Sequence, residues 1–492
     1  MQSSSNTLRG LGRPLGNLEI FFKTLSDQGK PLKREHWQIH LAISLQFPPS
    51  IQDPVPYLKC AWQIMRLRHP ELEAFVSADS NTIDSVPLSR LVPSQLNLDA
   101  WTANTFSILH QYSSADEAFS NLYATETPTC NWVPASSQLI IRASHWRTDG
   151  VGMALLGHNF MTALANTMSR GLEPLIVARA LGWDSFPKEQ ASIPRNLEEI
   201  ARSQSHNPEL HDVEEHPILA AGADALVAEF LKGVPSIGLP TIANSETTIP
   251  SCSDRTSRAL GADITKRISS ACREMGFTVT SAVHAAIICA TSSFPQHPLA
   301  KSYAAFVPVD LRQTLGDSAD RAIGLYFSGL PVCIDSTHWK EDTNPFESIA
   351  LQLGSVYSRD HVRFWKRPDD SGYLSLLDLV QPYVQRTTVL FNQPVPETLP
   401  LIQTPDLSSL GKVERFIQQE YYLESGGEVI KVSDFWLGTE MLNRSVQFHV
   451  WSWKGCLNLA ACFNTSFYTK SFVVGVIDLI VEKLLEECKV KE

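Results

Sequence analysis

The chain has 492 residues, of which 43% are hydrophobic, an ordinary proportion for a globular protein. Its formal net charge is −11, from 41 Lys and Arg against 52 Asp and Glu, and an acidic chain without a basic block does not favour nucleic acid as a partner. No segment approaches the about 18 uninterrupted apolar residues of a membrane helix, so we expect no membrane partner either.

The N-terminal segment and the cysteines indicate the compartment. The opening MQSSSNTLRGLGRPLG has no apolar stretch of the kind that a secretory signal needs. The nine cysteines are scattered and never form a C-x2-C pair, which argues against a disulfide framework or a structural zinc site. We therefore expect a cytoplasmic protein with reduced cysteines and no metal.

Three segments of the first half have a clear periodicity. Pro56–Arg68 has helical spacing, and His69-Pro70 ends it. Ser137–Ser144 is a short β-type run, and Val151–Ala165 again has the spacing of a helix. Residues 145–150 are therefore predicted to form a turn between a strand and a helix.

The middle of the chain differs in composition from both halves. Residues 187–253 are polar and punctuated by Pro and Gly, around one apolar segment at 218–231. We interpret this region as a crossover between two lobes. The predicted division is an N-terminal lobe at 1–215, a linker at 216–255 and a C-terminal lobe at 256–492.

The second half mixes helices and strands, which indicates α/β layers. Two helices are predicted, at Thr278–Ser292 and Lys470–Cys488. The predicted strands are Tyr303–Val309, Gly324–Ile334 with an interruption at Gly329, Val446–Val450 and Leu457–Phe463.

The predicted turn at 145–150 carries the candidate chemistry. His145, Asp149 and Gly150 form the pattern H-x3-D-G. A turn at this place can hold an imidazole with one nitrogen bound locally and the other free, as a general base requires. The pattern alone is weak, because a lone histidine is more often structural.

The flanking motifs strengthen this interpretation. With them, the turn resembles the active-site signature of the chloramphenicol acetyltransferase-like superfamily, which includes plant BAHD acyltransferases, peptide-synthetase condensation domains and fungal O-acetyltransferases of secondary metabolism. Length and the stretch Leu11–Glu19 are most similar to fungal trichothecene 15-O-acetyltransferase-like proteins. The other similar stretches, in the superfamily's order, are Ala61–Leu72, Gly276–Ala286, Val307–Arg312, Gly324–Pro331, Asn344–Glu347, Val389–Asn392 and Asp434–Gly438.

The resemblance implies a fold and a reaction. It implies two chloramphenicol acetyltransferase-like lobes, each a β-sheet flanked by helices, with an active-site tunnel between them and His145 at its middle. The acyl thioester would enter from one mouth and the acceptor from the other. His145 would take the proton of the acceptor hydroxyl and return it to the leaving thiolate, without an acyl-enzyme.

The resemblance also implies roles for the neighbours of His145. Asp149 would turn away from the substrate and pair with Arg312 of the second lobe, which holds the turn in place. Gly150 would permit the turn and the close approach of the helix, and its amide would face developing negative charge. The candidates for the tunnel wall are Ser328, Asn392 and Trp436.

Three positions depart from the superfamily's motifs. Ser144 stands where condensation domains carry the first of two histidines, which favours simple acyl transfer over peptide-bond formation. Ser328 replaces the usual Asn, and Trp436 replaces a Gly, so that 434–438 reads equally well as a buried strand end.

The other histidines look structural: His36 and His40 show no third metal ligand nearby, and His449 lies in an alternating strand whose tryptophans could line an acceptor pocket.

We therefore expect an acyl-CoA-dependent O-acyltransferase. The expected cosubstrate is acetyl-CoA, with no resident cofactor, and the expected acceptor is a hydroxylated apolar natural product such as a terpenoid or polyketide. Two alternatives remain. One is a condensation-like enzyme that takes its acyl group from an acyl carrier protein, and the other is a catalytically silent member of the fold that binds a natural product or templates its cyclisation.

Overall fold

A computed structural model describes residues 13–78, 89–92, 97–183, 193–205, 207–211, 216–242, 247–316, 321–424 and 426–491, and every structural statement below refers to them. Leu11 and Gly12 of the stretch that resembles the trichothecene enzymes lie outside this range. The helices are α1 (Asn17–Gln28), α2 (Val55–Arg68), α3 (Leu98–Thr105), α4 (Ala115–Asn121), α5 (Gly150–Arg170), α6 (Pro174–Ala180), α7 (Leu197–Gln204), α8 (Pro217–Leu231), α9 (Ala262–Glu274), α10 (Val279–Ser292), α11 (Arg312–Leu315), α12 (Thr337–Lys340), α13 (Pro345–Tyr357), α14 (Leu376–Asn392) and α15 (Lys470–Glu487).

The strands form two larger sheets and three smaller ones. A six-stranded sheet has the order β14-β15-β2-β7-β6-β5, and a four-stranded sheet has the order β13-β16-β17-β8. Their bounds are β1 (Arg13–Pro14), β2 (Ile39–Gln46), β3 (Phe75–Ala78), β4 (Ser89–Val92), β5 (Phe106–Ile108), β6 (Thr129–Val133), β7 (Gln138–Ala143), β8 (Ser253–Leu260), β9 (Ser302–Asp310), β10 (Phe327–Asp335), β11 (Trp365–Lys366), β12 (Tyr373–Leu374), β13 (Asp406–Lys412), β14 (Glu420–Tyr422), β15 (Val429–Thr439), β16 (Gln447–Trp453) and β17 (Cys456–Asn464).

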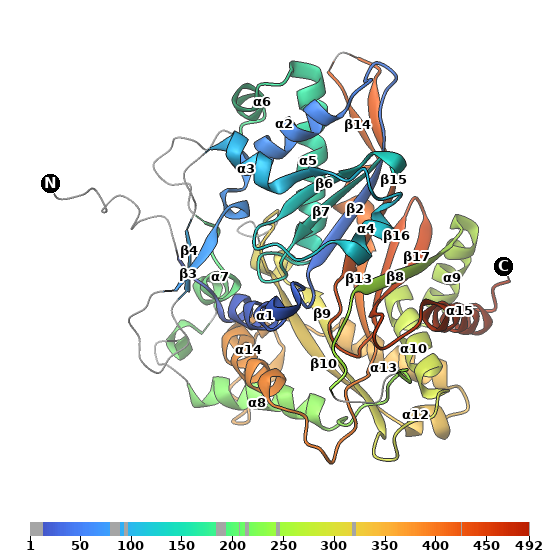
Figure 1. Ribbon diagram of the computed structural model, residues 1–492. Helices are drawn as coiled ribbons and strands as arrows, with labels where there is room; N and C mark the ends of the chain where they lie inside the picture. Colours follow the sequence, from blue (N-terminus) through green and yellow to red (C-terminus); the bar gives the residue numbers. More distant parts are fainter. Residues whose placement is uncertain are drawn as a thin grey trace.

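The long helix α5 lies against the six-stranded sheet. It approaches the sheet so closely that a Cβ at Gly157 would lie 2.8 Å from the Leu41 side chain of β2. Met153, Phe160 and Leu164 of α5 are fully buried, as the helical spacing predicts. In Figure 1 this sheet and α5 form the upper lobe, and the four-stranded sheet lies below it.

The second lobe is built around the four-stranded sheet and the hairpin of β9 and β10. The helices α10, α13 and α15 belong to its core, together with α8 and α14, which lie beside the hairpin in Figure 1. Strands β16 and β17 form the predicted antiparallel pair. Lys454 and Gly455 join them with positive φ values of 51° and 77°, as a two-residue hairpin turn requires.

The lobes differ from the expected contiguous segments 1–215, 216–255 and 256–492. Strand β15 comes from the last segment, yet it pairs with β2 in the first sheet; without it, β2 would expose unpaired backbone groups at an edge. In the opposite direction, α1 comes from the first segment and buries its apolar residues in the core of the second lobe. The expected linker contains α8, whose buried side chains belong to that same core.

The predicted elements are otherwise found within a few residues of their expected ends. The largest difference is α5, which continues to Arg170 and not to Ala165. Strand β10 begins at Phe327 and not at Gly324. The backbone of Gly324 and Tyr326 bonds to Arg312 and Asp149, so it is not available for a strand ladder. In the described part, no single helix is long and apolar enough to cross a membrane; α9 and α10 meet that test only as a pair bent by 92°.

Candidate active site

The turn between β7 and α5 is fixed by a helix cap. Asp149 is the N-cap of α5, and its Oδ1 accepts a hydrogen bond of 2.7 Å from the amide of Gly152. Aspartate is favoured at this position because it satisfies a free amide and complements the positive end of the helix dipole. The cap holds the five residues that follow the strand, including His145, in one conformation.

The carboxylate of Asp149 also binds the second lobe. Arg312 donates from Nη1 to Oδ2 at 3.0 Å, and Nη2 lies 3.0 Å from Oδ1. The amide of Tyr326 donates to Oδ2 at 2.9 Å. Asp149 is 5% exposed and Arg312 is 2% exposed, so this two-pronged ion pair is buried. The pair predicted between the two lobes is therefore present.

The remaining donors of Arg312 are used within its own lobe. Nε donates to the carbonyl of Ala322 at 3.0 Å, and Nη2 donates to the carbonyl of Gly324 at 2.9 Å. Nη1 also donates to Asp310 at 2.7 Å. Burial on its own would lower the pKa of Arg312, but the two carboxylates raise it above its ordinary value. The guanidinium therefore stays charged.

The imidazole of His145 lies among aromatic rings. Phe22 of α1 stacks on it with a centroid distance of 4.0 Å and an interplanar angle of 9°. Phe327 lies 5.7 Å away, and Trp37 meets it edge-on at 6.5 Å. Its Nδ1 is buried and has no hydrogen-bond partner among the described residues.

These surroundings keep the imidazole neutral. Burial lowers the pKa of His145 to about 4, although backbone groups of the turn and the charge of Asp149 act in the opposite direction. At neutral pH the ring is therefore in its base form. No hydrogen bond joins Asp149 to this imidazole in the described part, so the arrangement differs from a Ser-His-Asp triad.

Two glycines, Gly150 and Gly152, lie in the first turn of α5, and the second was not foreseen from the sequence. A Cβ at Gly150 would lie 3.3 Å from the flexible end of Leu410, whereas a Cβ at Gly152 would lie 2.3 Å from the carbonyl oxygen of Ile323. The close approach between the lobes therefore requires a glycine at 152. The spacing D-G-x-G after the turn is the signal that could have indicated it.

A buried carboxyl group lies behind the turn and was also not foreseen. Ser144 donates to Oε2 of Glu35 at 2.9 Å, while Oε1 of Glu35 is buried without a partner in the described part. Burial raises the pKa of Glu35 to about 7 against the hydrogen bonds from Ser144 and Ser26, and nearby Glu440 adds to the rise. Ser144, the residue before His145, is thus bound to Glu35, which lies just before strand β2.

The three candidates for the tunnel wall lie in different places. Ser328 is buried on β10 next to Phe327, and its Oγ has no partner among the described residues. Trp436 is buried on β15 and packs against Phe119 and under Arg255, at 6.0 and 4.1 Å. Asn392 is exposed at the end of α14 and binds the carbonyl of Thr388. Of the three, Ser328 directly follows Phe327, whose ring lies 5.7 Å from that of His145, but consecutive side chains of a strand point to opposite faces.

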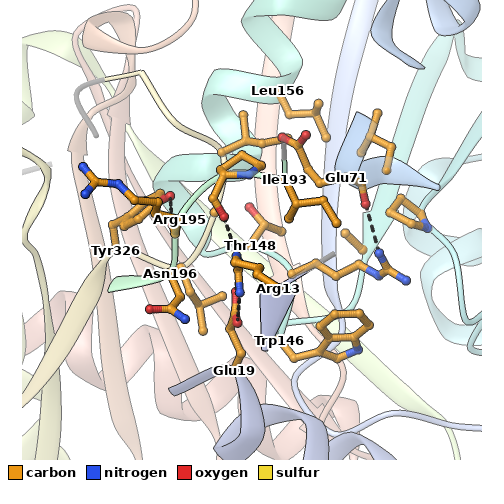
Figure 2. Close-up of a pocket in the computed structure, with 18 residues that line it drawn as sticks. Arg13, Glu19, Glu71, Trp146, Thr148, Leu156, Ile193, Arg195, Asn196 and Tyr326 are labelled. Carbon is orange, nitrogen blue, oxygen red and sulfur yellow. Dashed lines mark hydrogen bonds and ion pairs between the residues drawn. The ribbon is translucent and has the colours of Figure 1, made fainter. Parts of the chain in front are cut away.

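A pocket lies next to the motif turn, on the side of Trp146 and Thr148 (Figure 2). Arg13 and Glu19 form a two-pronged ion pair at its wall, with both distances 2.7 Å. His145 is not among the residues that line it. The full lining is Arg13, Glu19, Glu71, Leu72, Pro128, Ala143, Trp146, Arg147, Thr148, Leu156, Ile193, Pro194, Arg195, Asn196, Ile323, Gly324, Leu325 and Tyr326.

The other histidines near the turn have structural partners. Nδ1 of His36 accepts from the amide of Leu442 at 3.1 Å, and Nε2 of His449 lies 3.3 Å from the hydroxyl of Thr439. Burial lowers the pKa of both rings to about 3, and proximity to His145 contributes. His40 belongs to strand β2, so the helical i, i+4 spacing with His36 does not apply. Within the described ranges no group of three or more metal-ligating side chains is found.

The chain has relatives over almost its whole length. No family model matches it. It is 26% identical over 489 residues to the acetyltransferase pigO of Monascus ruber, which covers 98% of this chain and 96% of that protein. It is equally 26% identical over 489 residues to the loline biosynthesis cluster 1 transcription factor lolU1 of Epichloe uncinata, which covers 97% and 94%.

A solved structure has the same architecture. The TRI3 trichothecene 15-O-acetyltransferase from Fusarium sporotrichioides superposes with a TM-score of 0.72 at 18% identity, over 97% of this chain and 95% of that chain. This likeness confirms the expected fold class, a two-lobed condensation-like arrangement of sheets flanked by helices.

Proposed function

We propose that this chain, an acyltransferase of the chloramphenicol acetyltransferase-like superfamily, transfers an acetyl group from acetyl-CoA to a hydroxyl group of an apolar secondary metabolite such as a terpenoid or polyketide. One observation carries the proposal. The neutral imidazole of His145 lies on a turn that the buried ion pair of Asp149 and Arg312 holds between the two lobes.

His145 acts as the general base in this proposal. The hydroxyl oxygen attacks the carbonyl carbon of the thioester while its proton moves to the imidazole. The C–S bond then breaks, and the thiolate leaves with the proton that His145 returns. The pKa of about 4 keeps the ring unprotonated before the acceptor binds.

Asp149 and Arg312 have a positioning role in the same scheme. Both oxygens of Asp149 and all three nitrogens of Arg312 already have partners, either across the contact between the lobes or within their own lobe, so neither group is free to exchange a proton with the substrate. The pair instead fixes the turn, because a shift of about 1 Å at the base would cost much of the rate. Gly150 is the first residue of α5, and in this scheme its amide faces the developing negative charge.

The aromatic surroundings of His145 support an apolar acceptor. Rings of Phe22, Trp37 and Phe327 lie within 6.5 Å of the imidazole centroid, and such walls favour apolar ligands with few polar groups. The Oγ of Ser328 is buried without a partner among the described residues, and we propose a role in the tunnel wall for it. A role in the tunnel wall is also proposed for Asn392 and Trp436, but in the described part neither side chain contacts His145.

The proposal uses acetyl-CoA as cosubstrate and needs no resident cofactor. An acyl carrier protein as donor is the alternative, and Ser144 in place of the first condensation-domain histidine weighs against it. The name of the Epichloe relative suggests a regulatory function instead. The net charge of −11 does not favour binding to a polyanion.

The decisive experiment is an acetylation assay with the purified full chain. We would incubate it with acetyl-CoA and a panel of hydroxylated terpenoids and polyketides, and measure release of the CoA thiol together with the acetylated product by mass spectrometry. Thermal unfolding with acetyl-CoA, longer acyl-CoAs and free CoA tests donor binding independently, because a bound ligand raises the midpoint. Thiol release that depends on acceptor and on His145 supports the proposal. Absence of both stabilisation and turnover with every donor would overturn it in favour of the carrier-dependent or silent alternatives.

A further inference from the structure

We propose that Phe22 is a positioning residue whose ring face stabilises the positive charge that forms on His145 during the reaction. In a Ser-His-Asp triad a carboxylate does this for the imidazole. Here the carboxylate of the motif, Asp149, is bound to Arg312 and Tyr326. The face of the Phe22 ring lies against the imidazole instead. The inference rests on the proposed role of His145 as the base.

The geometry of the two rings is the first argument. Phe22 is buried on α1, and its ring lies nearly parallel to the imidazole, 4.0 Å from it and inclined by 9°. Neutral aromatic pairs gain most from edge-to-face or offset contacts. A cation, in contrast, is attracted to the face of a ring. The close parallel contact therefore suits the imidazolium better than it suits the neutral base.

The charges around His145 are the second argument. Among the described residues, Asp149 is the carboxylate that acts on the pKa of His145, and its oxygens already accept hydrogen bonds from Gly152, Arg312 and Tyr326. Two other titratable groups, His36 and His449, have pKa values that depend on His145. Both rings are neutral at pH 7, so they supply no negative charge. The imidazolium is left without a hydrogen-bonded counter-charge among the described residues.

The energetic need follows from burial. A buried charge without a partner is costly, and the low pKa of His145 reports that cost. During the reaction the proton leaves the acceptor oxygen, stays on the imidazole while the new C–O bond forms, and passes to the thiolate as the C–S bond breaks. The Phe22 face lowers the free energy of that charged interval and leaves the uncharged Michaelis complex almost unaffected. Its effect should thus appear in kcat.

The test is a graded change of the ring's electrons at constant shape. We would incorporate 4-fluoro-, 3,4,5-trifluoro- and pentafluorophenylalanine at position 22 of the full chain. Fluorine withdraws charge from the ring face, so kcat should fall stepwise, by about tenfold at the last member. KM for acetyl-CoA should stay within about twofold, and the acidic limb of the pH–kcat profile should move to lower pH.

Phe21 provides the matched control. It is the neighbouring residue of α1, is 8% exposed against 6% for Phe22, and contacts Phe391 at 5.4 Å. The same substitutions at Phe21 should leave kcat unchanged. A flat series at Phe22, or equal losses at both positions, would overturn the inference. If His145→Ala kept its activity, the proposed function itself would fail, and the two failures are therefore distinguishable.

Discussion

The two ends of the motif turn have opposite surroundings. At one end, Asp149 is a helix cap and an ion-pair partner, and both of its oxygens are bound. At the other end, His145 lies against aromatic rings with Nδ1 unpartnered in the described part. The first end is bound to both lobes, whereas the second has no ion-pair partner for its ring among the described residues. The turn therefore separates Asp149, which holds the two lobes together, from His145, the base that we propose.

The largest expected effect is on the His145 end. His145→Ala should reduce acetyl transfer by about 10²- to 10⁴-fold, because the general base is lost, while the unfolding midpoint stays close to that of the parent. The rate is measured by thiol release and the fold by circular dichroism. His297→Ala, at an exposed histidine, is the control and should change neither. Rates within threefold of the parent would refute the assignment of the base.

The second effect is on the Asp149 end and should appear as stability. Asp149→Asn and Arg312→Met should each lower the free energy of unfolding by about 3 to 5 kcal/mol, since each leaves a buried charge unpaired. The double variant should lose less than the sum of the two. Denaturant titrations of the four proteins measure this coupling. Additive losses would show that the two side chains act independently.

The sequence predicted the Asp149 end better than the His145 end. Asp149 and Arg312 stand in two motifs whose order resembles the superfamily, and the contact between them follows from that resemblance. Phe22 and Glu35 stand in no motif, and each meets the turn more than 100 residues away along the chain. An aromatic residue on an amphipathic helix is normally assigned to the core, and Phe22 is indeed there.

The same limit applies to the lobes: a local sequence pattern predicts a strand but not the sheet that the strand joins. Strands β7, β16 and β17 were predicted because alternation is a property of a few adjacent residues. That β15 crosses to the first sheet depends on the free edge of β2, almost 400 residues earlier. No periodicity within β15 contains this information. Trp436 illustrates the consequence, because its packing against Phe119 of α4 and Arg255 of β8 was not predictable from the motif around it.

The third prediction compares the two glycines next to Asp149. Gly152→Ala should destabilise by about 3 kcal/mol, because the new methyl group meets the backbone oxygen of Ile323 at 2.3 Å and a backbone cannot yield as a side chain does. Gly150→Ala meets only the end of Leu410 at 3.3 Å, so its cost should be below about 1 kcal/mol. Thermal unfolding of the two variants measures the difference. Equal losses would mean that the lobes do not approach each other most closely at residue 152.

The smallest expected effect concerns Glu35, behind the His145 end. Its pKa is raised to about 7 by burial, so the folded protein binds the proton more tightly than the unfolded chain, whose carboxyl has a pKa of about 4.5. Stability is then lost as pH rises from about 4.5 to about 7. Glu35→Gln keeps an acceptor for Ser144 and removes the titration.

Unfolding should be compared at pH 5 and pH 8 in the parent and in this variant. Two other buried carboxyls, Glu198 and Asp406, also have pKa values raised to about 7, so both proteins should be less stable at pH 8. The parent should lose about 2 kcal/mol more than Glu35→Gln over this range, whereas Glu209→Gln, at an exposed carboxyl, should follow the parent. An equal pH dependence in the parent and Glu35→Gln would show that Glu35 is ionised throughout. Ser144 would then donate to a permanent negative charge beside the base, and the contrast between the two ends of the turn would be smaller than the structure indicates.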